Sequence, residues 1–406
     1  MPEKNIPDCA ANLSKTLVKQ AGMFFDRNHL ITRTYHPMTA NEQELRQLRE
    51  RIDTLDRELL SLLNQRGRVA REIATCKDSH VGSQANGEHY YRPDREAEVL
   101  LKLLAANDGP LPDAEIARLF KEIMSACRAL QSPLSIAFLG PRGTFTEVAA
   151  LRHFGQSVKT VPFDAIDQVF RKVESGECDC GVVPVENSSE GVVNHTLDMF
   201  IRSPLLICGE VMLRIHHYLL ALPSEDSDVE QVQRVYSHQQ SLAQCRKWLD
   251  RHLPGADRIA VASNAEGARS ASLEPGTAAI ASNIAARIYG LDTLASNIED
   301  EPDNTTRFLV IGSQKVPNSG EDKTSLLLSV KDRPGALLGL IEPFARRAIS
   351  MTRIESRPAC SGLWEYVFFV DIEGHAQDPH IAEALQEIER NTTLFKVLGS
   401  YPKAVV

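Results

Sequence analysis

The chain has 406 residues, so at roughly 150 residues per domain we expect two to four domains and exclude a single small binding module. Hydrophobic residues make up 43% of the sequence and charged residues 24%, which excludes a disordered chain. The 45 Lys and Arg residues are outnumbered by 54 Asp and Glu residues, which gives a formal charge of -9 and disfavours binding to nucleic acid.

The first part of the chain divides into an extension and a helical unit. Residues 1 to 40 have mixed charge and no sustained helical period, so we expect a poorly ordered N-terminal extension, with Met38 as an alternative start. Leucine and isoleucine then recur at steps of three and four, which predicts one amphipathic helix from about 42 to 76. These positions are Leu45, Leu48, Ile52, Leu55, Leu59, Leu62 and Leu63.

Two shorter helices complete a predicted unit from 41 to 132. A polar stretch rich in Gly, Asn and Ser ends the first helix, a second helical pattern begins near Pro93, and a third covers about 113 to 130. Three helices in about 90 residues bury little apolar surface on their own. We therefore expect this unit to pack as a homodimer or a higher homo-oligomer.

The pattern changes after Pro133. From 133 to 315, short β-branched runs alternate with helical stretches, which predicts a two-lobed α/β domain with largely parallel strands and a cleft. Beyond a polar linker, residues 323 to 406 follow the order strand, helix, strand, strand, helix, strand. This order is typical of the split βαβ arrangement of small ligand-sensing α+β domains.

Arginines on the first helix indicate a pocket for an anion. Arg49 and Arg66 lie 17 residues apart, close to five turns at about 3.6 residues each, so both can point to the same side. Forked guanidinium donors suit the planar carboxylates of a dicarboxylate, whereas a solvated helix face is the alternative explanation for each arginine.

The string LRERIDTLDRELLSLLNQR, followed by Lys77, RPDREAEVL and FKEIMSACRALQ, resembles the all-helical chorismate mutase domain. With the two later units in the same order, the match extends over about 41 to 406 to the bifunctional chorismate mutase/prephenate dehydratases. The resemblance implies that Arg49 reaches into the site of the partner subunit and that Arg66 and Arg95 bind the substrate carboxylates. It also implies that Lys77 and Gln131 bind the ether oxygen and that Glu96 holds the substrate hydroxyl group. Cys127 is implied as a further substrate-binding residue.

The implied mutase reaction is an intramolecular rearrangement that needs no cofactor. Catalysis then comes from holding chorismate in its reactive shape and stabilising charge on the ether oxygen. Two features depart from the family pattern, because Arg92 sits where many relatives have an acid and the loop from 78 to 90 is long. We expect mutase activity to survive both.

Three polar motifs follow strands in the central unit. The motif at 140 to 146 opens a helix and can bind an anion at the helix N-terminus, although an ordinary turn is the alternative. The motifs at 183 to 189 and 237 to 240 come directly after strands, where ligands of α/β sheets bind. The residues that we expect to contact substrate are Thr144, Glu186, Ser188, Ser237 and His238.

The string NTTRF at 304 to 308 resembles the TRF motif of prephenate dehydratases. The residues implied are Thr306 as the catalytic group, with Asn187, Gln240 and Arg307 as its companions. Dehydration releases carbon dioxide and the C4 hydroxyl group, and aromatisation drives it. A threonine hydroxyl is a weak acid, so we assign Thr306 a hydrogen-bond donor role and leave Glu186, His238 and water as alternative proton sources.

The histidines and cysteines point to no metal site. His216 and His217 are adjacent on a predicted strand, so their side chains point to opposite faces, and we interpret both as structural. The 8 cysteines are scattered without a CxxC pair, which argues against zinc and disulfide frameworks. No apolar run approaches the roughly 20 residues that span a bilayer, and the N-terminus lacks a leader pattern, so we expect a cytoplasmic protein.

The C-terminal unit carries RPGAL at 333 to 337 and ESRP at 355 to 358, which resemble motifs of ACT domains. The resemblance implies that L-phenylalanine binds between two such domains as an allosteric inhibitor. The residues implied are Gly335, Ala336, Leu337, Glu355, Ser356, Arg357 and Pro358. Glycine lets the backbone approach an amino acid closely, and the ligand carboxylate suits a helix N-terminus.

The resemblance as a whole implies a multidomain enzyme with an all-α mutase domain, a two-lobed α/β dehydratase domain similar to periplasmic binding proteins, and an α+β ACT domain. Such an enzyme converts chorismate to prephenate and then prephenate to phenylpyruvate, carbon dioxide and water, under feedback inhibition by phenylalanine. Two alternatives stay open, a dehydratase with a degenerate mutase domain and a non-catalytic sensor of aromatic acids. Retention of Thr306 with Asn187 and Gln240 argues against the sensor.

Overall fold

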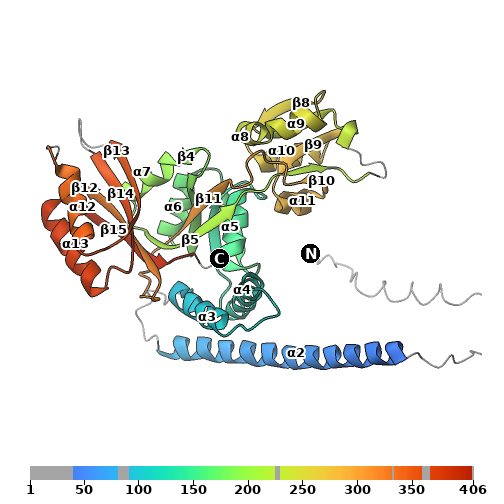
Figure 1. Cartoon of the computed structure of the whole chain (residues 1–406), viewed down its shortest axis with the longest axis horizontal. Helices are drawn as coiled ribbons and strands as arrows, with labels where there is room; N and C mark the ends of the chain where they lie inside the picture. The colour runs from blue at the N-terminus through green and yellow to red at the C-terminus, as the bar shows by residue number, and fades with distance from the viewer. Residues whose placement is uncertain (1–39, 81–90, 225–228, 332, 359–365, 405–406) are drawn as a thin grey trace, which may run out of the picture. The chain divides into compact units, whose positions relative to one another are not determined.

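The computed structural model describes residues 40–80, 91–224, 229–331, 333–358 and 366–404 (Figure 1). The predicted N-terminal extension therefore lies outside the described residues, apart from Ala40. The described residues up to Ser61 belong to one compact unit, and the described residues from Leu62 onward belong to the other. No helix in the described part of the chain combines the length and apolar character needed to cross a bilayer.

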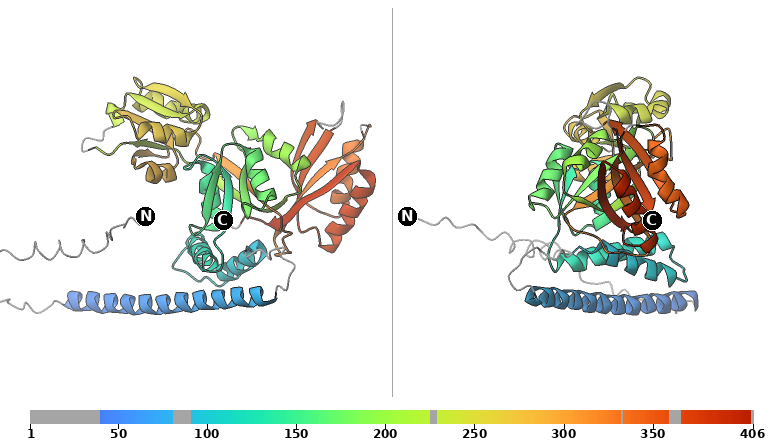
Figure 2. Two further views of the ribbon diagram at one scale, coloured as in Figure 1. Left: turned by 180° about the vertical axis from the view of Figure 1, so that it is seen from behind. Right: turned by 90° about the vertical axis from the view of Figure 1, so that its left-hand side faces the viewer.

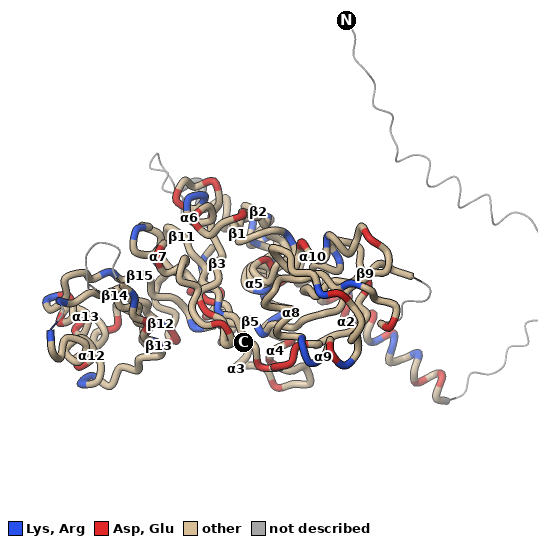
Figure 3. The backbone as a smooth tube through the Cα atoms, turned by 90° about the horizontal axis from the view of Figure 1, so that it is seen from above, with Lys and Arg blue, Asp and Glu red and all other residues tan. Residues whose placement is uncertain are grey.

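The first helix, α2, runs from Ala40 to His80 without a break. Leucine and isoleucine recur along it at the predicted spacing, yet side chains such as Leu55 and Leu59 are each 57% exposed in the single chain. Basic and acidic residues alternate along the same helix (Figure 3). The helix thus keeps an uncovered apolar stripe beside a mixed-charge surface.

Two further helices follow at the predicted positions, α3 (Pro93–Ala105) and α4 (Asp113–Ala129). Pro93 opens α3, where its fixed φ suits the first turn and its missing N–H costs no hydrogen bond. The two helices pack through a small core of Leu100, Ala117 and Met124. A core of this size is too small to hold a domain by itself.

The first lobe of the central unit is a mixed sheet in the order β2-β1-β3-β11-β5, with the short β4 beside β3. Strand β11 comes from the far end of the unit and runs antiparallel to both of its neighbours. Strands β2, β1 and β3 pair in parallel as predicted, but antiparallel pairs occur in both lobes, so the prediction of largely parallel strands was only partly right. The bounds are β1 (Ser135–Leu139), β2 (Lys159–Phe163), β3 (Cys180–Asn187), β4 (Gly191–Val192), β5 (Leu206–Arg214), β11 (Thr305–Gly312), α5 (Phe145–Phe154), α6 (Ile166–Glu174) and α7 (Asn194–Arg202).

The second lobe is inserted between β5 and β11 and forms a sheet in the order β10-β6-β9-β7-β8. Small buried residues such as Ala279 and Ala281 let its helices pack closely on the central strand. The bounds are β6 (Tyr218–Ala221), η1 (Val229–Gln231), β7 (Arg234–His238), α8 (Gln239–Gln244), α9 (Arg246–His252), β8 (Asp257–Val261), α10 (Asn264–Ala271), β9 (Thr277–Ala281), α11 (Asn283–Tyr289) and β10 (Asp292–Ser296).

The C-terminal domain has the predicted split βαβ order, with a sheet β13-β14-β12-β15 whose neighbouring strands are all antiparallel. Its helices α12 and α13 lie together on one side of this sheet (Figure 2). The other face shares one core with the first lobe, where Leu327, Phe369 and Tyr401 join Val185 and Leu309. The bounds are β12 (Asp322–Ser329), α12 (Ala336–Arg346), β13 (Met351–Pro358), β14 (Tyr366–Glu373), α13 (Pro379–Asn391) and β15 (Leu394–Pro402).

Candidate functional site

A cleft of about 500 Å³ is lined by residues of both lobes of the central unit. The first lobe contributes the ends of β3 and β11 and the start of α5, and the second lobe contributes the turn from β7 into α8. Both contributions lie at strand ends, where the backbone leaves the sheet and polar side chains reach a ligand. The predicted residues that line the cleft are Thr144, Asn187, His238, Gln240 and Thr306.

The centre of the cleft is a hydrogen-bonded pair, Asn187 and Thr306, which face each other across neighbouring strands. Asn187 Nδ2 donates to Thr306 Oγ1 at 2.8 Å and to Asn304 Oδ1 at 2.8 Å, while its Oδ1 accepts from the backbone N–H groups of Ser189 and Glu190. These bonds fix the amide orientation. Because Thr306 Oγ1 accepts a bond from Asn187, its own O–H is available as a donor.

The second-lobe residues fall into two groups. His238 caps α8 by accepting from the N–H of Gln240, and both side chains line the cleft. Ser237, in contrast, is fully buried, with its Oγ 2.7 Å from the Ile280 carbonyl oxygen and 3.0 Å from Asn264 Oδ1. Ser237 therefore supports the turn and does not line the cleft.

Among the polar residues of the cleft that sequence reasoning did not assign to the site are His217, Gln244 and Asn304. His217 is fully buried, its Nε2 lies 2.9 Å from Gln244 Oε1, and burial lowers the pKa of its ring. Within the described residues, His217 Nδ1, Gln244 Nε2 and Asn304 Nδ2 are buried without a hydrogen-bond partner. Unpaired buried polar atoms are costly, so a ligand that satisfies them gains affinity.

The two histidines were predicted on a strand, but they lie in the connection between β5 and β6. Their side chains have different partners all the same, because His216 Nδ1 contacts Glu299 at 2.7 Å. The structural interpretation of both histidines is thus too simple for His217. Gln244 carried no signal, because a glutamine inside a helix resembles any surface glutamine.

Besides Ser237, three more predicted residues lie outside the cleft. Glu186 Oε2 contacts Arg353 Nε of the C-terminal domain at 2.9 Å. Ser188 Oγ accepts from the N–H of Thr305 at 3.0 Å and so closes the strand start. Arg307 is buried against the C-terminal domain, because adjacent residues on a strand point to opposite faces and Thr306 takes the cleft side.

At the helix start, Thr144 Oγ1 donates to the Leu139 carbonyl oxygen at 3.0 Å and lines the cleft without capping α5. The first-turn N–H groups of α5 are therefore not used by that side chain. The buried Glu147 carboxylate accepts from the N–H of Gly143 at 2.6 Å and fixes the preceding turn. The anion contact expected at 140 to 146 stays a prediction, because the Glu147 carboxylate already accepts from this turn.

The predicted mutase residues occupy the three helices. Arg49 is exposed on α2, whereas Arg66 is partly buried, with Nη1 3.5 Å from the Ile123 carbonyl oxygen. The side chain of Lys77 lies outside the described residues. On α3, Arg95 is exposed and pairs with Glu98. On and after α4, Cys127 is buried and Gln131 is partly buried.

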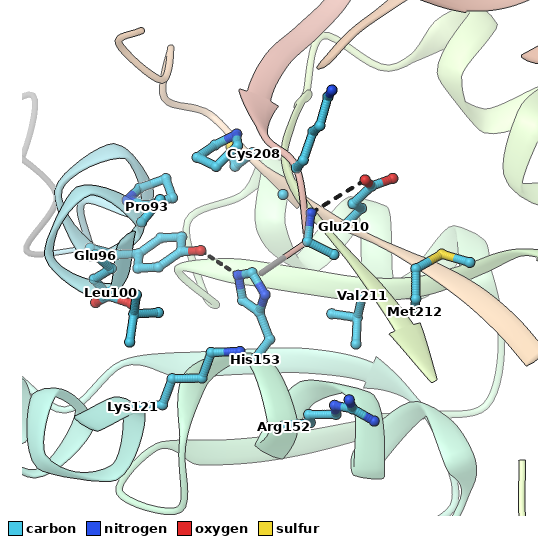
Figure 4. Close-up of a pocket in the computed structure, with 16 residues that line it drawn as sticks. Pro93, Glu96, Leu100, Lys121, Arg152, His153, Cys208, Glu210, Val211 and Met212 are labelled. Atoms are coloured by element: carbon cyan, nitrogen blue, oxygen red, sulfur yellow. Dashed lines mark hydrogen bonds between the residues drawn. The ribbon is translucent and has the colours of Figure 1, made fainter. Parts of the chain in front are cut away.

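Glu96 lines a cavity of about 310 Å³ where α3 and α4 meet α5, β5 and the end of β15 (Figure 4). Its carboxylate pairs with Arg128, and burial raises the pKa of Glu96 although Arg128 opposes the shift. Three further cations, Lys121, Arg152 and Lys403, line the same cavity. Of the predicted mutase residues with described side chains, Glu96 is the one that lines it.

A buried tyrosine and a histidine join the helices to the first lobe at this cavity. Tyr91 OH hydrogen-bonds His153 Nε2, a bond dashed in Figure 4. Arg128 stacks over the Tyr91 ring. Arg128 Nη2 also donates to the Phe154 carbonyl oxygen at 2.8 Å. Burial lowers the pKa of His153 to about 3, with Lys121 and Arg128 acting in the same direction. His153 is therefore neutral near neutral pH.

The two predicted effector motifs lie apart within the chain. Gly335 precedes α12 in the left-handed conformation, with φ +78°, and Ala336 lines a cavity of about 490 Å³. Leu337 is 43% exposed. The motif from 355 to 358 continues the outer strand β13, where Glu355 and Arg357 are partly buried and Ser356 and Pro358 are exposed. Arg357 Nη2 contacts Asp198 Oδ1 at 3.0 Å.

Comparison with known proteins covers the same three parts of the chain. Chorismate mutase type II matches residues 48–132, prephenate dehydratase matches 136–316, and the ACT domain matches 324–390. The bifunctional chorismate mutase/prephenate dehydratase of Pseudomonas aeruginosa is 52% identical over 367 residues, which cover 90% of this chain and 100% of that protein. The protein of the same name from Neisseria gonorrhoeae is 51% identical over 88% of this chain and 97% of its own length.

Among solved structures, the prephenate dehydratase from Arthrobacter aurescens in complex with L-phenylalanine superposes with a TM-score of 0.61 at 37% sequence identity. The superposition covers 67% of this chain and 93% of that protein. About two thirds of the chain therefore shares the fold of that prephenate dehydratase.

Proposed function

Because this chain belongs to the family of bifunctional chorismate mutases/prephenate dehydratases, which rearrange chorismate to prephenate and dehydrate prephenate to phenylpyruvate, we propose that Asn187 and Thr306 form the centre of its dehydratase site. The observation that carries the proposal is the bond from Asn187 Nδ2 to Thr306 Oγ1. It occupies the oxygen of Thr306 and leaves the O–H to donate toward the cleft.

The reaction needs a donor at the hydroxyl group that leaves. Prephenate loses its ring carboxylate as carbon dioxide, the C–C bonding electrons enter the ring, and the C4–O bond breaks as the oxygen takes up a proton and departs as water. Thr306 donates a hydrogen bond to that oxygen as charge grows on it. Since Glu186 is held by Arg353 outside the cleft, the proton comes from His238 or from water.

The unpaired polar atoms of the cleft supply substrate recognition. The amide N–H groups of Gln244 and Asn304 suit the carboxylate oxygens of prephenate, and the N–H groups at the start of α5 add a further anion contact. His217 donates Nε2–H to Gln244 Oε1 and presents Nδ1 as an acceptor for a substrate hydroxyl group. Gln240 and Thr144 complete the wall.

The mutase site is proposed on α2, α3 and α4, with Arg66, Arg95, Glu96, Gln131 and Cys127 from one subunit. Lys77 completes that set, and Arg49 is supplied by a second copy of the chain. The exposed apolar stripe of α2 supports such an assembly, since a single chain leaves it uncovered.

For regulation, we propose that L-phenylalanine binds between the C-terminal domains of two copies. Gly335, Ala336 and Leu337 of one copy and the motif 355–358 of the other enclose the amino acid. The exposed positions of Leu337 and Ser356 support a contact made by a second chain.

The decisive experiment replaces Thr306 by valine, which keeps the shape and removes the hydroxyl. Phenylpyruvate formation from prephenate is expected to fall about a hundredfold or more, since one donor in a preorganised site contributes that much. Chorismate consumption should be unchanged. Thr305→Val is the matched control, because Thr305 Oγ1 donates to the Asp303 carbonyl oxygen at 3.1 Å outside the cleft. Equal activity of Thr306→Val and the control would refute the proposal.

A further inference from the structure

The back of the Asn187–Thr306 pair faces the C-terminal domain. Strands β3 and β11 lie side by side, with Thr306 opposite Asn187 and, one residue along, Arg307 opposite Glu186. Because side chains alternate along a strand, the first pair points into the cleft and the second pair points away from it. On each strand, one peptide bond joins a residue of the cleft pair to a charged residue. Glu186 precedes Asn187 on β3, and Arg307 follows Thr306 on β11.

Both charged residues are held by the C-terminal domain. Glu186 Oε2 lies 2.9 Å from Arg353 Nε on β13, and Arg307 Nη1 lies 2.5 Å from Asp371 Oδ2 on β14. Arg353 and Asp371 are themselves cross-strand partners. Two neighbouring strand pairs, one in each domain, therefore meet through four alternating charges, which we call the charge quartet (Glu186, Arg307, Arg353 and Asp371).

Three members of the quartet are largely shielded from water, whereas the side chain of Glu186 is 40% exposed. The side chains of Arg307 and Asp371 are 9% and 7% exposed, and that of Arg353 is 12% exposed. Arg307 also donates to Glu210 Oε2 at 2.9 Å and to Tyr401 OH at 3.0 Å. Buried, multiply bonded charges have one favourable geometry, so movement of β13 or β14 is passed on to β3 and β11.

The proposed effector motif lies on the same strand. Arg353, Glu355 and Arg357 are the partly buried face of β13, and Arg357 reaches Asp198 on α7. Arg353 Nη2 and Arg357 Nε and Nη1 are buried without a partner among the described residues. Unpaired donors show that this contact is not fully satisfied, which leaves room for a second arrangement of the same charges.

We propose that Arg353 and Asp371 are positioning residues of the dehydratase site, which hold Glu186 and Arg307 from behind and thereby set Asn187 and Thr306 in the cleft. An effector bound at β13 then acts on catalysis through these two residues. The inference rests on the proposed function, because it assigns a route of control to the same site.

The test uses the full chain with Arg353→Gln, Asp371→Asn and the double variant. The control is Glu373→Gln, two residues along β14, whose partner Lys403 at 2.8 Å belongs to the same domain. Prephenate turnover, KM, the phenylalanine concentration for half-inhibition, chorismate turnover and unfolding temperature are measured for each. Arg353→Lys is added as a conservative variant that keeps the charge.

For Arg353→Gln and Asp371→Asn we expect kcat on prephenate to fall about tenfold with KM changed less than about twofold, because the site is misplaced and substrate contacts remain. Half-inhibition should require at least about fivefold more phenylalanine. The kcat of the double variant should be no lower than that of the less active single variant, since both residues act through one unit. Arg353→Lys should recover most of kcat, and the control should match the unmodified chain.

The inference is overturned if both glutamine and asparagine variants unfold at lower temperature yet keep unmodified kcat and inhibition, since that result describes a purely structural contact. If Asp371→Asn does not fold, Arg353→Gln decides the matter by the same criteria. Failure of the proposed function looks different: the unmodified chain then makes no phenylpyruvate, or Thr306→Val keeps full activity. One combination of results removes the inference and leaves the proposed function intact. In that case the unmodified chain is active, Thr306→Val is inactive, and Arg353→Gln keeps the unmodified kcat and the unmodified inhibition by phenylalanine.

Discussion

A neutral histidine, His153, helps to join the helical unit to the first lobe. Its Nε2 bonds Tyr91 OH, and its ring packs edge-on against Tyr91 and Phe154. Burial, Lys121 and Arg128 all disfavour the charged ring, so the pKa of His153 is lowered to about 3. The folded junction therefore keeps this ring neutral well below the pH at which a free imidazole takes up a proton.

The sign of the pH effect follows from linkage. In the unfolded chain the ring titrates near about 6.5, so below that pH the unfolded state binds a proton that the folded state refuses. Stability from this residue is complete above about pH 6.5 and is lost as the pH falls toward 3. Between pH 7 and pH 5 the loss amounts to about 2 kcal/mol.

We therefore expect His153→Gln to be less sensitive to acid than the unmodified chain. Urea unfolding at pH 7 and pH 5 measures the difference, which should shrink by about 2 kcal/mol in the variant. His252→Gln is the control, because His252 is exposed and contacts the Trp248 carbonyl oxygen at 3.0 Å. An identical acid loss in His153→Gln and the control would contradict the assignment.

At this scale the sequence predicted residues that follow strands and missed those that do not. Asn187 and Thr306 come at strand ends, so their place in a cleft follows from the fold class. Arg307 was grouped with them because it is adjacent in sequence, although alternation sends it to the opposite face. Gln244 and Asn304 reach the cleft through long-range packing, which no local pattern encodes.

Helix α2 is the element that leaves the most apolar surface uncovered. Along its length, side chains such as Ile52, Leu55, Leu59 and Leu62 are each 57–59% exposed in the single chain. In proteins a helix is stabilised mainly by packing of its apolar face. The stripe predicts association of two chains through α2.

Replacing Leu55 and Leu59 by glutamate should therefore weaken association and reduce chorismate turnover, because the proposed Arg49 contact comes from a second copy. Light scattering gives the molar mass, and the dimer should dissociate at a protein concentration at least about tenfold higher than for the unmodified chain. Arg57→Glu is the control on the polar face, where Arg57 bonds within its own helix. Unchanged mass and chorismate turnover would show that the stripe is not the contact.

Element positions were predictable where periodicity is strong. The first helix was expected at about 42 to 76 and runs from Ala40 to His80, and the split βαβ order was predicted in full. The place of β11 between β3 and β5 was not predicted, because pairing of residues more than a hundred positions apart leaves no local pattern. That pairing nevertheless brings Thr306 to Asn187.

At the scale of the molecule, the dehydratase lobe and the C-terminal domain are not independent. Their facing sheets share one core, in which Leu398 and Phe369 pack with Phe200 and Ile207. Beside that core, Glu210 of the lobe accepts from Lys323 of the C-terminal domain at 2.7 Å and from Arg307 at 2.9 Å. Removing the domain uncovers apolar surface and strands buried charges.

A chain ended after Ser319 should therefore lose more than its response to phenylalanine. We expect it to aggregate or to unfold at least about 10 °C below the full chain, since loss of a large shared core and of a buried ion pair costs several kcal/mol. Calorimetry and prephenate turnover at low temperature measure both effects. In the full chain, Glu373→Gln controls for loss of a surface charge in the same domain. If the shortened chain kept the unfolding temperature and turnover of the full chain, the shared core would be a contact between two separately stable domains.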